Sequence, residues 1–201
     1  PLANPEFFER LGRRVITALA QVTGDGFVFR VDMRLRPNGD SGPLVVSNEM
    51  LEEYLVALGR EWERFAWLKG RVVSAPVFAS DDEFARQRAA LEAIVQPFVF
   101  RKYLDFGAIA SLRELHARIR AETERRTGGR DDAGDNVKLG RGGIREIEFL
   151  AQTFQIIRGG REPRLRSRST LTTLACLAEL GSLPSETAGR LAAGSRLPSA
   201  S

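Results

Sequence analysis

GFVFRVDMRLRPNGDSGPLVVS, which occupies residues 26–47, is the stretch that decides the expected fold of the first part of the chain. From Phe27 to Leu35 every second residue is apolar and lies on one face, and Asp32 shares the other face with Arg30, Arg34 and Arg36. Such alternation is typical of a strand with one wet, charged face. The turn-forming run 37–42 and the short apolar run 44–46 follow, so we expect a β-hairpin.

The lone carboxylate of Asp32 has two interpretations on these residues alone. A carboxylate between arginines on a strand is often part of a solvated ladder of ion pairs. Alternatively, Asp32 binds a metal ion, because the three arginines make the face positive and suited to an anion such as a nucleotide phosphate bridged by that metal. Both interpretations stay open at this point.

Composition limits the class of protein. The chain has 201 residues, of which 43% are hydrophobic, enough for one or two packed units. Its net charge of +4 comes mostly from arginine, which supports a nucleic-acid partner only weakly, and we expect none. The one histidine, His116, lies among charged residues, which argues against histidine catalysis. The one cysteine, Cys176, lies in an apolar run, so we expect it to be a core residue of a protein in a reducing compartment. We also expect no membrane span and a cytoplasmic location.

Helical periodicity dominates the rest of the chain. A glycine- and aspartate-rich loop is expected at 127–135, and 185–201 lacks a long helical pattern. The glycines before residue 144 have two interpretations. Either they only let the chain enter a helix, which is common, or they leave the first amides of that helix free to bind an anion. We expect six helices. The first begins at Asn4, the second covers 48–71, the third runs from a cap at Asp81 to Pro97, and the fourth covers 98–126. The fifth runs from 144 to about 158, and the sixth begins at Ser169 or Thr170.

Four motifs resemble those of the glutamine synthetase adenylyltransferase/adenylyl-removing enzymes, a family in the polymerase-β-like nucleotidyltransferase superfamily. They are VDMRLRPNGDSGPLV (31–45), GREWERFAWLKGR (59–71), KLGRGGIREIEF (138–149) and RGGREPRLRSRS (158–169). The resemblance implies an α+β, mainly helical fold. Residues 1–97 would be the C-terminal part of a nucleotidyltransferase domain, 98–135 a linking helix and loop, and 136–201 the start of a helical bundle.

The resemblance also implies roles for particular residues. Asp32 matches the third member of a carboxylate triad that holds two Mg²⁺ ions and is therefore the expected catalytic and metal-binding residue. The family's first two carboxylates have no counterpart here, so this piece alone is expected to be inactive. The other expected residues bind nucleotide or phosphate: Arg30, Arg34, Arg36, Lys69 and Arg71, with Lys138, Gly142, Gly143, Arg145, Glu146 and Glu148 as further candidates.

The implied function is removal of AMP from an adenylylated tyrosine of glutamine synthetase, with phosphate as acceptor and ADP as product. Motifs 59–71 and 158–169 favour this adenylyl-removing half of the bifunctional enzyme. The implied partners are glutamine synthetase, a PII-type nitrogen regulatory protein, phosphate and ADP or ATP. Two alternatives remain: the half that adds AMP from ATP, and a non-catalytic helical module that docks on glutamine synthetase or a regulatory protein.

Overall fold

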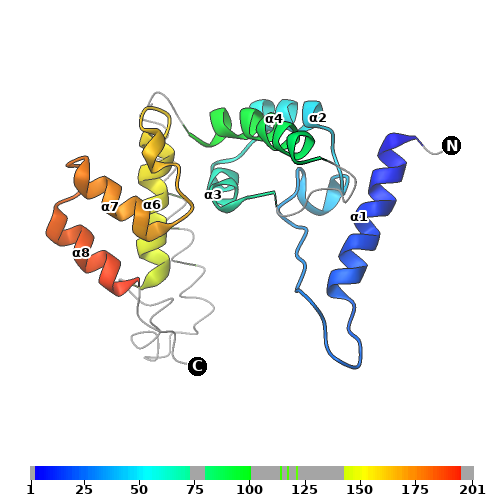
Figure 1. Cartoon of the computed structure of the whole chain (residues 1–201), viewed down its shortest axis with the longest axis horizontal. Coiled ribbons are helices and arrows are strands. Elements are labelled where there is room, and N and C mark those ends of the chain that lie inside the picture. The colour runs from blue at the N-terminus through cyan, green and yellow to red at the C-terminus, as the bar shows by residue number, and fades with distance from the viewer. Residues whose placement is uncertain are drawn as a thin grey trace.

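A computed structural model shows a mainly helical chain (Figure 1). It describes residues 3–72, 80–100 and 143–195, together with Glu114, Ala117 and Ala121. The expected helix 98–126 lies largely outside the described residues, and the expected loop 127–135 lies wholly outside them. The described elements are α1 (Asn4–Ala20), η1 (Gly39–Ser41), α2 (Asn48–Ala57), α3 (Glu61–Lys69), α4 (Asp81–Val99), α6 (Ile144–Arg158), η3 (Pro163–Leu165), α7 (Thr170–Glu179) and α8 (Ser185–Gly194).

The hairpin expected at 26–47 is wrong. Within this stretch the structure has turns and the 3-10 helix η1, and the nearest β feature is an isolated bridge between Thr23 and Gly26. A two-stranded hairpin is marginal without further strands, and the described residues form none that could pair with it. The helical part of the expected fold class is therefore confirmed, whereas its β part is absent from the described residues.

The first helix begins at Asn4, as expected, with Pro5 in its first turn. The N-cap is Ala3, which makes no side-chain bond. None of the residues of α1 is buried. After α1 the chain turns back, and the Phe29 amide donates to the carbonyl of Leu19 at 2.9 Å. The segment that carries Asp32 thus starts against the C-terminal end of α1.

The single helix expected over 48–71 is two helices. Ser47 caps α2 through its hydroxyl, and α3 starts after a break at residues 58–60. A β-carbon on Gly59 would lie 2.4 Å from the ring of Phe98 and 2.5 Å from the carbonyl oxygen of Leu55. Only glycine allows α4 to approach the chain so closely at this point. The glycine at this break is therefore required by a contact with Phe98, 39 residues later, which helical periodicity does not reveal.

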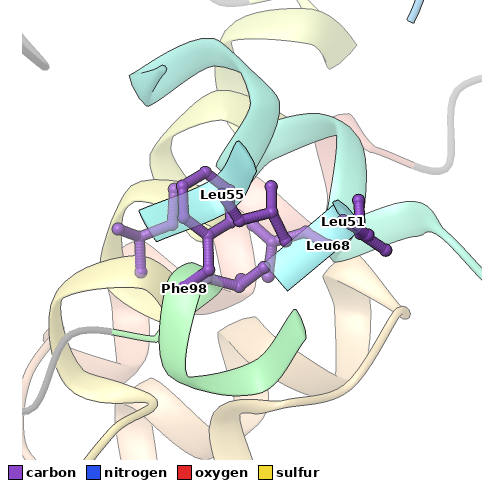
Figure 2. Packing of buried hydrophobic residues seen from close by; sticks show 6 residues of the cluster. Leu51, Leu55, Leu68 and Phe98 are labelled. Carbon is purple, nitrogen blue, oxygen red and sulfur yellow. The ribbon is translucent and has the colours of Figure 1, made fainter. Parts of the chain in front are cut away.

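Ser80, rather than the expected Asp81, caps α4, because its hydroxyl accepts a bond from the Glu83 amide. The helix continues past Pro97, its expected end, to Val99. Its last two residues, Phe98 and Val99, are buried, which favours this continuation. The largest core cluster of the described residues joins four helices, and its buried members are Leu51, Leu55, Leu68, Phe98, Val99 and Ile156. Figure 2 shows this packing and labels the first four of them.

The C-terminal helices α6, α7 and α8 pack side by side at one end of the molecule (Figure 1). Ser169 caps α7, as expected, and α6 ends at Arg158 before two glycines. Cys176 is buried, which confirms the expected core cysteine, and burial raises the pKa of its thiol. The stretch after 185 contains the short helix α8. Among the described residues, no helix is both long and apolar enough to cross a bilayer.

Ile156 of α6 shares its cluster with residues of α2, α3 and α4. The rings of Phe65 in α3 and Phe149 in α6 also stack, with centroids 4.9 Å apart. Residues from the two sides of the expected boundary region therefore share a core. The boundaries at 97 and 136 themselves stay a prediction.

Candidate functional site

Asp32 lies on the surface segment between α1 and η1. Both of its carboxylate oxygens face Arg34, whose Nη2 is 2.6 Å from Oδ2 and whose Nε is 3.0 Å from Oδ1. The Arg34 backbone amide also donates to Oδ1 at 3.0 Å. These side-chain and backbone bonds lower the pKa of Asp32 from 3.8 to about 2. The carboxylate is therefore ionised at neutral pH and, with 48% of its side chain exposed, open to solvent.

The three arginines predicted to share a face with Asp32 have different environments. Arg36 is largely buried and fastens the turn, because its guanidinium donates to the carbonyls of Met33, Asp40 and Gly42. Arg34 is exposed but occupied by Asp32. Arg30 is exposed, and no hydrogen bond or ion pair joins it to another described residue. Arg30 is thus the arginine best placed to meet an anion without breaking an existing contact.

A second group of predicted residues meets where α3 ends and α6 begins. Lys69 Nζ lies 3.5 Å from Glu148 Oε1 and donates to the Arg168 carbonyl at 3.1 Å. Arg71 and Arg145 are exposed nearby in sequence, and Glu146 is half-buried. Gly143 is the N-cap of α6 and supplies no side-chain bond, so the first amides of the helix have no side-chain acceptor from the cap. Lys138 and Gly142 lie outside the described residues.

The structure keeps these two groups apart. In Figure 1 the segment that follows α1 lies on the α1 side of the molecule, whereas α6 lies toward the opposite end, beyond α3. In the part of the chain that the structure describes, no three acidic, histidine or cysteine side chains come together in a way that could hold a metal ion. A Mg²⁺ ion needs several oxygen ligands, and the described residues do not bring such a set together around Asp32.

Sequence reasoning missed several polar residues that organise the helices. Glu63 is buried and accepts bonds from the Tyr54 hydroxyl at 2.9 Å and the Arg60 amide at 2.7 Å, which joins α2 to α3. Burial and this bond to Glu63 raise the pKa of Tyr54. The buried Gln155 donates to the carbonyls of Leu165 and Ser167. A polar residue within an apolar helical stripe, such as Gln155, is the sequence signal that could have identified this class.

Comparison with known proteins adds an independent observation. Residues 1–87 match the family model described as glutamate-ammonia ligase adenylyltransferase, and residues 113–197 match the model described as GlnD PII-uridylyltransferase. A bifunctional glutamine synthetase adenylyltransferase/adenylyl-removing enzyme from Ralstonia nicotianae is 55% identical over 95% of this chain. The chain is a homologue of these bifunctional enzymes. The proteins of the same name from Aromatoleum aromaticum and Burkholderia mallei are 58% and 59% identical over 95% and 87% of this chain, respectively.

The chain spans about a fifth of the length of these adenylyltransferase/adenylyl-removing relatives, between 18% and 21%. The matches confirm the resemblance expected from the four motifs. The relatives of this chain are named as adenylyltransferase/adenylyl-removing enzymes of glutamine synthetase.

Proposed function

We propose that this chain is part of an enzyme that removes AMP from an adenylylated tyrosine of glutamine synthetase by phosphorolysis, with ADP as product. The observation that carries the proposal is the 55% identity to a bifunctional adenylyltransferase/adenylyl-removing enzyme over 95% of the chain. Motifs 59–71 and 158–169 support the adenylyl-removing half. The adenylyl-adding half is the second candidate, since the relatives' name covers both activities.

In this proposal Asp32 contributes one carboxylate to a Mg²⁺ site whose other ligands come from outside the described residues. Its ionised state at neutral pH supports the assignment, because Mg²⁺ prefers charged oxygen ligands. The metal would offset the charge on the phosphates during transfer. Arg30 would contact phosphate directly, and Arg34, whose guanidinium pairs with Asp32, would bind phosphate beside it. Arg36 holds the turn in place.

Further residues are assigned on the resemblance and on their exposure. Arg71 and Arg145 are exposed cations, two residues after Lys69 and three residues before Glu148 in the sequence, and they suit phosphate or nucleotide. Lys138, Gly142, Gly143 and Glu146 stay candidates from the glycine-rich motif. A PII-type regulatory protein and cytoplasmic location complete the proposal, and the second matched model, named for PII uridylylation, gives the PII partner its support.

Asp32→Asn in the full-length enzyme tests the proposal. The assay measures phosphate-dependent release of ADP from adenylylated glutamine synthetase in the presence of Mg²⁺. We expect a rate loss of about a hundredfold or more, because one oxygen ligand of the metal is removed while the fold is kept. Asp25→Asn, on the same exposed segment, is the matched control and should leave the rate within a few-fold of wild type.

Three outcomes distinguish the adenylyl-removing function from the two alternatives and test the role of Asp32. If the Asp32 variant keeps wild-type activity, the assignment of Asp32 is wrong. If the wild-type enzyme releases pyrophosphate while adding AMP from ATP, and Asp32→Asn abolishes that reaction instead, the chain belongs to the adding half. If neither reaction depends on Asp32 but binding of glutamine synthetase depends on this region, the docking module is correct. The 201-residue chain alone should release no ADP.

A further inference from the structure

Helix α6 is held against α3 and α4 at two places that differ in chemistry. Near its C-terminal end Ile156 is fully buried in the cluster that includes Leu68 and Phe98. Arg166, which follows this end of the helix, donates to the Gly159 carbonyl at 2.7 Å and to Gln96 Oε1 at 2.9 Å, and its guanidinium lies over the ring of Phe100. We call this group, formed by Ile156, Arg166, Gln96 and Phe100, the anchor.

The N-terminal part of α6 is held by a contact that water can reach. Lys69, at the end of α3, has its Nζ 3.5 Å from Glu148 Oε1, 3.1 Å from the Arg168 carbonyl and 3.5 Å from Thr170 Oγ1. One lysine from the first part of the chain thus binds both the first half of α6 and the start of α7. The side chains of Lys69 and Glu148 are 41% and 40% exposed.

The two places therefore resist separation unequally. Apolar burial at the anchor is not screened by salt as an exposed ion pair is. The guanidinium of Arg166 is half-buried and donates hydrogen bonds to Gly159 and Gln96. Exposed ion pairs are weak and are screened by salt. The Phe65–Phe149 stack beside Glu148 adds a moderate attraction. Glu148 and Ile156 are eight residues apart, which is about 12 Å along a helix, so the weak end has room to move while the anchor stays closed.

We infer that Lys69 is a positioning residue that acts as a reversible ionic latch: when its contacts with Glu148 and Arg168 break, the first half of α6 and the start of α7 separate from α3 while the anchor stays packed. The inference is independent of the function proposed above, because it rests on contacts within this chain. It assigns Lys69 a different task from the phosphate binding that its sequence motif suggests. Two of the three N–H donors of its ammonium group already make hydrogen bonds, to the Arg168 carbonyl and to Thr170 Oγ1, and Glu148 is its ion-pair partner.

NMR relaxation dispersion on the 201-residue chain measures this opening, since the method detects minor states on the microsecond-to-millisecond scale. Exchange is expected at amides 65–69, 146–150 and 168–170 and not at 155–159. Lys69→Met keeps the aliphatic stem but removes the charge, and it should raise the open population about two- to fivefold. Raising the NaCl concentration from 0.05 to about 1 M should act in the same direction, because the pair is exposed.

Two variants separate a latch from general damage. Lys69→Arg keeps the charge and should stay within about twofold of wild type. Arg88→Met removes the cation of the Arg88–Glu92 pair, which is similarly exposed but lies within α4, so it should leave the open population unchanged. Exchange that is equal at the anchor amides would overturn the inference, as would an open population that Lys69→Met and salt do not change. An equal effect of Arg88→Met would also overturn it, since loss of any surface charge would then suffice.

Discussion

Replacing Ile156 by alanine tests whether the two sides of the boundary region fold as one unit. Ile156 belongs to α6, yet it is fully buried against residues of α2, α3 and α4. Each buried methyl or methylene group contributes about 0.8 kcal/mol, so the three lost groups sum to about 2.4 kcal/mol. The cavity left behind adds to this loss, and isoleucine-to-alanine changes in cores cost about 2–5 kcal/mol. We expect the free energy of unfolding to fall by about 3–4 kcal/mol.

Urea denaturation followed by two signals measures the effect. Circular dichroism reports all helices, whereas fluorescence reports α3, because both tryptophans, Trp62 and Trp67, lie in that helix. Ile156→Ala should shift both transitions together. In thermal melts a loss of 3–4 kcal/mol corresponds to a Tm about 6–16 °C lower for a chain of this size. The control is Val56→Ala in α2, because Val56 is 84% exposed and should change stability by less than about 0.5 kcal/mol.

Two results would refute this reasoning. A loss below about 1 kcal/mol would mean that α6 is not packed into the cluster that Figure 2 shows. A fluorescence transition that stays in place while the dichroism transition shifts would mean that α6 unfolds independently of α3. Either result would mean that α6 does not share a core with α3, and the anchor on which the latch depends would then not exist.

Two further predictions concern charge and packing. NMR titration should give Asp32 a pKa of about 2, and Arg34→Met should raise it toward 3.8. Since this pKa is lowered in the folded chain, the ion pair stabilises the fold above about pH 4 and is lost as pH falls through 2, and a pKa unchanged by Arg34→Met would contradict the assigned cause. Gly59→Ala should destabilise the chain by about 1–3 kcal/mol through its clash with Phe98, whereas Gly189→Ala, with open space around it in α8, should stabilise it by about 0.5–1 kcal/mol. Equal melting temperatures for these two variants would contradict the close approach at Gly59.

Local chemistry in the sequence determined most helix starts and ends. Pro5 marks the first turn of α1, Ser169 caps α7, and the glycines after Arg158 end α6. Each of these features acts on amides or carbonyls within a few residues, so a pattern read along the chain finds them. The motifs at 31–45, 59–71, 138–149 and 158–169 likewise carried the resemblance that the homologues confirm.

Only the tertiary structure decided the features that depend on distant partners. Alternation over 27–36 predicted a strand, but a strand exists only where another pairs with it, and this segment instead forms turns fastened by Arg36. The need for glycine at the break between α2 and α3 comes from Phe98, and the partners of Lys69 lie 79 to 101 residues away along the chain. Periodicity identifies which face of an element is apolar, whereas the identity of the neighbour on that face is fixed only when the helices pack.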